Sequence, residues 1–151
     1  MTGSRKTLEA SYARTLLPLA RTWRQAADRA LASMGLSASS GWALIQVGRL
    51  GDDVRQIDLA HELDISGASM VRLIDQMVGA GLVDRRADEA DRRVSRVCLT
   101  KRGAALTSTI EATLGDMRHD LLAGLSDAEL AGALAVALHV EATFTRMRSV
   151  A

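Results

Sequence analysis

The connection Ile65-Ser66-Gly67 limits the possible folds more than any other stretch of the chain. It joins two short segments whose apolar residues recur at the spacing of one helix face. In the first segment, over residues 57–63, the inward-facing residues are Leu59, Ala60 and Leu63. In the second, which Ser66 caps, the residues expected to face the core are Met70, Val71, Leu73, Ile74, Met77 and Val78. Two short helices joined by so tight a turn predict a helix-turn-helix.

Longer helices are expected before this motif. The 151 residues are 48% hydrophobic, only 3% aromatic and include one proline, a composition typical of a mainly helical chain with an aliphatic core. A first helix should end near Gly35, and Pro18 within it predicts a kink near residues 14 to 18 or a helix that restarts there. A second helix should span Ser37 to Leu50 and be closed by Gly51-Asp52-Asp53.

After the motif the pattern changes to that of short strands. Leu82-Val83 and, further on, Val97 and Leu99 lie in segments consistent with two strands, separated by an acidic tip at residues 87–91. Two more helices follow, with caps expected at Thr100, Gly124 and the capping box Ser126 to Glu129. The chain therefore predicts a charged β-hairpin set among helices.

The hairpin carries a local excess of positive charge. The whole chain has a formal charge of only +1, but residues 85–102 hold seven basic side chains against three acidic ones. Binding to phosphates depends on such a local field and not on a high overall pI. The alternative is a solvated hairpin whose mixed charges neutralise each other.

The stretch from Leu59 to Leu106, LAHELDISGASMVRLIDQMVGAGLVDRRADEADRRVSRVCLTKRGAAL, resembles the winged helix-turn-helix core of the MarR family (multiple antibiotic resistance regulators). The shared pattern runs LA-x-x-L-x-[IV]-S, V-x-R-L-[VI]-D-x-L, G-L-V-x-R, a D-P-x-D-x-R wing and V-x-L-T-x-x-G. The chain also departs from the family in places. Glu89 stands where the family has proline in the wing, and Arg55 stands near the usual threonine cap of the first helix of the motif.

The resemblance implies a mainly α fold, with a small β-hairpin wing and long N- and C-terminal dimerisation helices. Residues 37–99 would form the DNA-binding region, and residues 1–36 with 100–151 the helical dimerisation region, in one intertwined domain. The apolar surface expected on Leu8, Tyr12 and Leu16 and on Leu130, Leu134, Leu138 and Phe144 suits a homodimer. The alternative is a monomer whose terminal helices pack only on each other.

The second helix of the motif has the residue types of a major-groove reader. Arg72 suits guanine and Gln76 suits adenine, while Ser66, Ser69 and the helix N-terminus suit phosphate or base edges. An alternative for Arg72 is an exposed arginine paired with Asp75 or Gln76.

In the hairpin, the resemblance assigns Arg93 to the minor groove, with Asp91 holding its guanidinium. Arg86, Arg92 and Arg96 are expected to add phosphate contacts. The partner these elements imply is double-stranded DNA with a pseudo-palindromic operator.

A small effector, commonly aromatic and anionic in the family, is also implied. Trp42 and Gln46 lie one turn apart, and Trp23 is able to approach them from the first helix. The alternative is that both tryptophans are plain core. A thiol-sensing role for Cys98 has little support, since no second cysteine exists.

The residue inventory argues against an enzyme. The three histidines are scattered, and there is no metal-spaced cluster, phosphate-cradling glycine loop or nucleophile elbow, so no cofactor or metal is expected. No apolar run reaches the roughly 18 residues of a membrane span, which favours a cytoplasmic protein. The expected function is a dimeric, sequence-specific DNA-binding transcription regulator. Of the two kinds of regulator, we expect a repressor, which a small aromatic or anionic ligand releases from DNA. The alternatives are an architectural DNA-binding protein without sequence choice and a winged helix that docks a protein.

Overall fold

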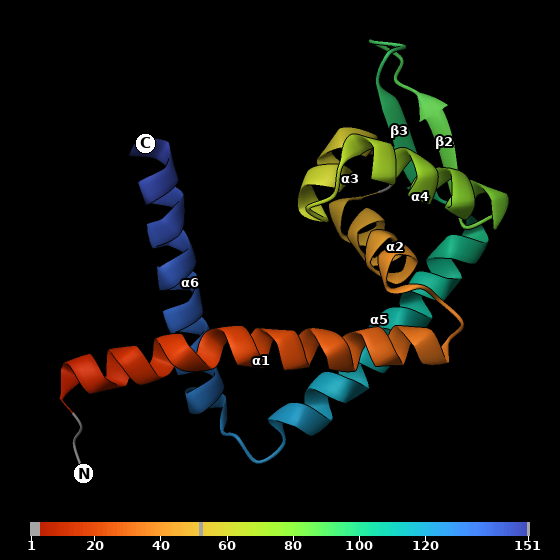
Figure 1. Cartoon of the computed structure of the whole chain (residues 1–151). Coiled ribbons are helices and arrows are strands. Elements are labelled where there is room, and N and C mark those ends of the chain that lie inside the picture. Colours follow the sequence, from red (N-terminus) through yellow and green to blue (C-terminus); the bar gives the residue numbers. More distant parts are fainter. Residues whose placement is uncertain (1–3, 52, 151) are drawn as a thin grey trace. The chain divides into compact units, whose positions relative to one another are not determined.

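The structure is a computed structural model that describes residues 4–51 and 53–150. Helices dominate it, and a small antiparallel sheet lies beside the helix-turn-helix (Figure 1). The helices are α1 (Arg5–Ser33), α2 (Ala38–Leu50), α3 (Gln56–Glu62), α4 (Gly67–Gly79), α5 (Lys101–Leu122) and α6 (Asp127–Val150), and the strands are β1 (Val54–Arg55), β2 (Val83–Ala87) and β3 (Ser95–Leu99). The predicted mainly helical, winged helix-turn-helix fold is confirmed.

The chain divides into two compact units, Met1–Asp116 and Met117–Ala151. The first unit contains the hydrophobic core, formed by aliphatic side chains of α1, α2, the helix-turn-helix, the sheet and α5. Its largest fully buried side chains include Leu31, Leu44, Ile45, Leu59, Met70, Ile74, Met77 and Ile110. The second unit consists of the end of α5 and α6.

The helix-turn-helix is formed by α3 and α4. Asp64 closes α3 with a left-handed φ of 51°, and the backbone N–H of Ile65 donates to the carbonyl of Ala60 (3.1 Å). Ser66 caps α4, because its hydroxyl accepts a hydrogen bond from the N–H of Ser69 (3.2 Å). The predicted turn and cap are therefore confirmed.

The buried stripe of α4 is narrower than the sequence predicts. Met70, Leu73, Ile74 and Met77 are buried, but Val71 and Val78 are each 40% exposed, so their assignment to the core is wrong. Each residue advances about 100° around a helix. Val71 and Val78 consequently lie at the edge of the stripe, on a flank that α3 and the sheet do not cover.

The sheet has three strands in the order β1-β3-β2, one more than the predicted hairpin. In the register, Val54 lies opposite Val97 and Arg55 opposite Arg96. On the other side of β3, Arg86 lies opposite Arg96. Arg55 occupies the N-cap position of α3 without a side-chain capping hydrogen bond, and its backbone pairs in β1 instead.

The helix α1 runs through Pro18 without restarting, so a restart at this position is wrong. Pro18 lacks the N–H that the carbonyl of Arg14 would accept, but this part of α1 is exposed and water can supply the missing donor. The helix ends at Ser33, followed by Gly35 with a φ of 73°, as predicted. Of the turn predicted after α2, Gly51 is the C-cap, while residue 52 lies outside the described residues.

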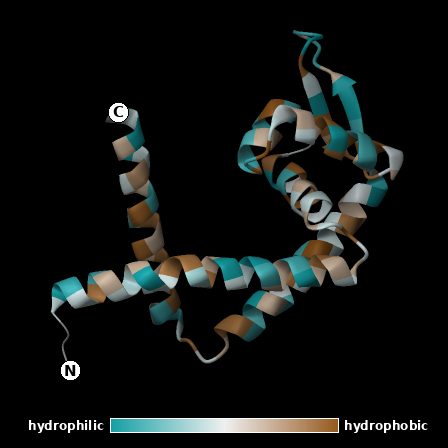
Figure 2. Cartoon of the chain, viewed as in Figure 1, coloured by the Kyte–Doolittle hydropathy of each residue, from teal (hydrophilic) through white to brown (hydrophobic). Residues whose placement is uncertain are grey.

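The α6 helix begins with the predicted capping box. The N–H of Ser126 donates to the carboxylate of Glu129 (2.8 Å), and the N–H of Glu129 donates to the Ser126 hydroxyl (3.3 Å). No α6 side chain from Asp127 to Ser149 is buried, and brown apolar segments remain visible on its ribbon in Figure 2. Within the described part of the chain, no single helix is long and apolar enough to cross a membrane. The helices Lys101–Leu122 and Asp127–Ser149, taken together as a bent pair, are long and apolar enough by length and composition alone.

Candidate nucleic-acid interface

The α4 helix exposes a polar face opposite its buried stripe. Ser69, Arg72 and Gln76 are all exposed on this face. The Arg72 guanidinium makes only a long contact, from Nε to the carbonyl of Ala68 (3.5 Å), and it forms no ion pair within residues 4–51 and 53–150. Asp75 pairs with Arg85 of β2 instead (2.7 Å), so the alternative pairing of Arg72 with Asp75 does not occur. Arg72 is free to contact a partner.

The hairpin of β2 and β3, with its tip at residues 88–94, forms the wing. In it, the Arg93 guanidinium donates to both carboxylate oxygens of Asp91, at 3.1 and 3.2 Å. The Arg93 backbone N–H donates to the same carboxylate (3.0 Å), and this arrangement lowers the pKa of Asp91. The Arg93 side chain is 92% exposed and projects from the wing, and its contacts with Asp91 favour one orientation. Arg92 is exposed beside it and forms no ion pair with any described residue.

Asp88 organises the wing tip, a role that the sequence did not reveal. Although only 8% exposed, it accepts hydrogen bonds from the N–H groups of Ala90 (2.8 Å) and Asp91 (3.1 Å) and from the Arg96 guanidinium. The hydrogen bond from Arg96, followed by those from the backbone, lowers the pKa of Asp88 to about 2. These bonds fix the tip although Glu89 replaces the proline of the family pattern. The sequence alone does not predict the pairing of Asp88 with Arg96, because the two residues meet only in the register that the folded hairpin adopts.

Asp53, just before β1, binds two arginines of the sheet. Its carboxylate lies 3.0 Å from Arg86 Nη2 and 3.2 Å from Arg96 Nη1, and its carbonyl accepts from Arg96 Nη1 (2.9 Å). The Arg96 side chain is only 25% exposed, so its expected role as a phosphate contact does not fit these internal contacts. Arg86 is 58% exposed but reaches a phosphate only by leaving Asp53. The alternative in which acidic and basic side chains of the hairpin neutralise each other is therefore partly correct, since Arg86 and Arg96 both pair with carboxylates.

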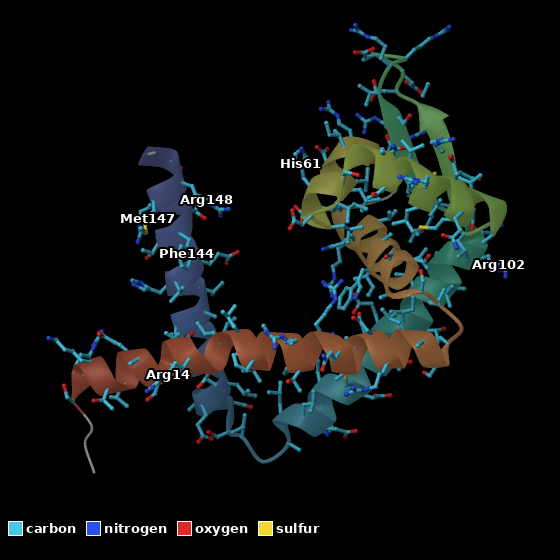
Figure 3. All side chains as sticks on the ribbon, viewed as in Figure 1. Arg14, His61, Arg102, Phe144, Met147 and Arg148 are labelled. Carbon is cyan, nitrogen blue, oxygen red and sulfur yellow. The ribbon has the colours of Figure 1, made fainter. Side chains whose placement is uncertain are left out.

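A groove of about 510 Å³ runs between α3, the start of α4 and residues 93–95, where the wing tip meets β3. Its walls are mainly apolar, with Ile57, Met70, Val71 and Val94 among the lining residues, and Arg93 and His61 also border it. Gln56 lines it as well, and its Oε1 atom is buried without a hydrogen-bond partner. Figure 3 labels His61, which lies on α3.

The candidate ligand residues belong to the first unit, with Trp23 on α1 and Trp42 and Gln46 on α2. Trp23, Trp42 and Gln46 are half-buried. The Trp42 indole N–H donates to Asp28 (2.8 Å), and the Arg24 guanidinium stacks over its ring at 4.4 Å. Trp42 is therefore held at the edge of the core by a carboxylate and a cation.

The outer helices, by which we mean the N-terminal helix α1 and the C-terminal helix α6, expose large apolar side chains. On α1 these include Leu8, Leu17 and Leu19, and on α6 they include Leu134, Leu138, Phe144 and Met147, all more than half exposed. Figure 3 shows Phe144 and Met147 projecting from α6. Both α1 and α6 therefore present large apolar side chains that no described residue buries.

The described residues contain no group of three or more His, Cys, Asp or Glu side chains placed to hold a metal ion. Cys98 is half-buried in β3, and its thiol contacts the carbonyl of Asp84 (3.8 Å).

Comparisons with known proteins agree with this geometry. A model of the MarR family matches residues 34–94. The chain is 32% identical to the solved transcriptional regulator PA3341, over 89% of this chain and 98% of that one, with a TM-score of 0.80. The MarR family transcription regulator SP03579 is 23% identical over 97% and 96% of the two chains, with a TM-score of 0.83. A mutant of MarR from E. coli, solved in complex with operator DNA, is 20% identical over 91% and 99%, with a TM-score of 0.73.

Proposed function

The chain belongs to the MarR family of transcription regulators, which are DNA-binding proteins and not enzymes, and on this premise we propose that it is a homodimeric, sequence-specific repressor. A small aromatic or anionic molecule would release it from a pseudo-palindromic operator. The observation that carries the proposal is the exposed Arg72 on α4, free of any ion pair with the described residues, beside a wing that projects Arg93.

The α4 helix would lie in the major groove. Arg72 would pair with O6 and N7 of a guanine, and Gln76 with an adenine. Ser66 and Ser69 lie at the N-terminus of α4, where the helix dipole and free N–H groups favour a phosphate. These assignments rest on residue type and on the exposure of Ser69, Arg72 and Gln76 on one face.

The wing would insert Arg93 into the adjacent minor groove. Asp91 supports this role because its bidentate contact favours one orientation of the guanidinium before DNA arrives. Arg92 would contact a phosphate directly. Arg86 would do so after exchanging Asp53 for the phosphate.

Dimerisation would bury the exposed apolar side chains of the outer helices, in residues 1–36 and 100–151. A two-fold axis through these helices would place two copies of α4 about 34 Å apart, one turn of DNA, which fits a pseudo-palindromic site read by residues 37–99. Support comes from the exposure of Leu134, Leu138 and Phe144 in the single chain.

The effector site would include Trp23, Trp42 and Gln46. An aromatic ring would stack on an indole, and the Arg24 guanidinium over Trp42 would attract an anionic group. Binding there would act on α1 and α2 and so alter the separation of the two reading helices.

The first experiment selects binders from a random duplex library at near-physiological salt with random competitor DNA. The proposal predicts a two-fold symmetric motif with half-sites about ten base pairs apart. Retention without a motif would indicate an architectural protein, and no retention at all, by protein first freed of any bound small ligand, would indicate that the wing docks a protein. Either result contradicts the proposal.

Two variants separate base reading from phosphate binding. Arg72→Ala should cost about 1–3 kcal/mol on the enriched site and relax the preference at one position of each half-site. Arg93→Ala should weaken binding to all sequences and reduce the salt slope by about one per half-site. Arg21→Ala, an exposed arginine of α1, is the control and should change neither. If Arg72→Ala lowers the affinity for enriched and random duplexes equally, Arg72 does not make the proposed base contact.

A further inference from the structure

The sheet register brings three arginines into one row. Arg55 of β1 lies opposite Arg96 of β3, and Arg96 lies opposite Arg86 of β2. Side chains that are directly opposite in neighbouring strands lie on the same face of the sheet, and like charges in such positions repel each other. The row therefore needs carboxylates beside it.

Asp53 and Asp88 supply these carboxylates unequally. Arg96 is held three times, by the Asp88 carboxylate, by the Asp53 carbonyl (2.9 Å) and by the Asp53 carboxylate (3.2 Å). For Arg86, the structure gives one ion-pair partner among the described residues, the Asp53 carboxylate, at 3.0 Å from Nη2 and 3.2 Å from Nε. Loss of the Asp53 carboxylate would therefore release Arg86 while Arg96 keeps two of its three contacts.

We propose that Asp53 binds Arg86 as an internal substitute for a DNA phosphate and thereby limits both the affinity and the salt dependence of DNA binding. The inference rests on the proposed function, since it requires the wing to face the DNA backbone. Its chemical basis is that a carboxylate and a phosphate accept the same paired N–H donors of a guanidinium.

Solvent access makes the exchange feasible. The Arg86 side chain is 58% exposed and that of Asp53 is 37% exposed, so a phosphate can approach the pair without disrupting the core. Exposed ion pairs are weak because water screens both charges. The Asp53 carboxylate also raises the pKa of Arg86, which agrees with direct contact between the two groups.

The test measures duplex affinity against salt concentration for the native chain, Asp53→Asn and the control Glu89→Gln. Glu89→Gln also removes one negative charge, at the wing tip, where Glu89 forms no ion pair with a described residue. Of the carboxylates that raise the pKa of Arg86, Asp53 contributes most and Glu89 least. One added phosphate contact steepens the slope of log K against log salt by about 0.9, which corresponds to a gain of about fivefold at 0.15 M salt relative to 1 M. Asp53→Asn should show this steepening and gain for each half-site on both enriched and random duplexes, and Glu89→Gln should leave the slope unchanged.

The gain should depend on Arg86. Adding Arg86→Gln to Asp53→Asn should remove it, whereas Arg86→Gln in the native chain should reduce affinity less than Arg92→Gln, because only Arg86 must first leave a carboxylate. This last comparison does not depend on the folding of Asp53→Asn.

The outcomes distinguish this inference from the proposed function. A native chain that binds duplex DNA, together with equal slopes for Asp53→Asn and Glu89→Gln, overturns the role of Asp53 and leaves the function standing. A loss for Arg86→Gln equal to or greater than that for Arg92→Gln also overturns it. A native chain without affinity for any duplex overturns both.

Discussion

Gly103→Ala tests how closely α5 packs on the sheet. A Cβ at position 103 would lie 1.9 Å from the carbonyl oxygen of Leu82 and 2.9 Å from its carbonyl carbon. These are backbone atoms, so the methyl group can be accommodated only if the first turn of α5 moves by about 1 Å or more. Overpacking of a core typically costs about 1–3 kcal/mol, and a clash with backbone belongs at the upper end of this range.

The same shift would disrupt the Thr100 cap. The Thr100 hydroxyl accepts from the N–H of Gly103 (3.0 Å) and donates to the carbonyl of Gly81 (2.7 Å), so it joins the start of α5 to the segment before β2. Loss of such a cap costs about 1 kcal/mol, which is roughly offset by the higher helix propensity of alanine. We therefore expect a net loss of about 3 kcal/mol, out of the roughly 5–15 kcal/mol that stabilises a folded domain.

Urea unfolding followed by circular dichroism, at one fixed protein concentration, measures this loss. With a slope of about 1–3 kcal/mol per molar urea, the midpoint should fall by about 1 M or more. Gly79→Ala is the matched control, since a Cβ there meets nothing within 4 Å, and it should stabilise the chain by up to about 1 kcal/mol. A Gly103→Ala midpoint equal to that of the native chain would show that the packing argument is wrong.

The difference in stability between the native chain and Asp88→Asn should depend on pH. The pKa of Asp88 is about 2 in the folded chain, below its ordinary 3.8, so the carboxylate stabilises the fold above pH 4 and this stabilisation is lost between about pH 4 and 2. The urea midpoints of Asp88→Asn and the native chain should differ at pH 7 and converge near pH 2; a constant difference would contradict this role. In α6, Leu138→Glu should convert the proposed dimer to monomers in sedimentation experiments, while Leu50→Glu, at a similarly exposed leucine of α2, should not. A dimer that persists in Leu138→Glu would exclude α6 from the interface.

The sequence predicted the helices and their caps because those signals are local. Ser66, Thr100 and Ser126 each bind an N–H three residues later, and Gly35 and Gly124 adopt the positive φ that ends a helix. Four-residue spacing of apolar side chains identified α4 in the same way. The edge of the buried stripe of α4 was less well predicted, since the sequence shows that Val71 is apolar but not whether a neighbour covers it.

The sheet and the ion pairs were not predictable, because they join distant parts of the chain. Two residues, Val54 and Arg55, are too few for β1 to show a period of two, and only the pairing with β3 defines it. The contacts of Asp53 span 33 residues to Arg86 and 43 to Arg96. Which arginine meets which carboxylate follows from the strand register, and one residue of slip would move every side chain to the other face.

The ion pairs also change the meaning of the charge excess in residues 85–102. Asp75 and Asp53, both outside this run, pair with Arg85 and Arg86, so seven basic side chains face five acidic ones and not three. Among the described arginines of the wing, Arg92 forms no ion pair, and each of the others must share or exchange a carboxylate to reach a phosphate. On the proposed function, sequence-independent attraction to DNA would therefore be weaker than the number of arginines in the wing suggests. On the proposed function, a larger share of the free energy of operator binding would then come from the base contacts proposed for α4, above all from Arg72, which forms no ion pair with a described residue.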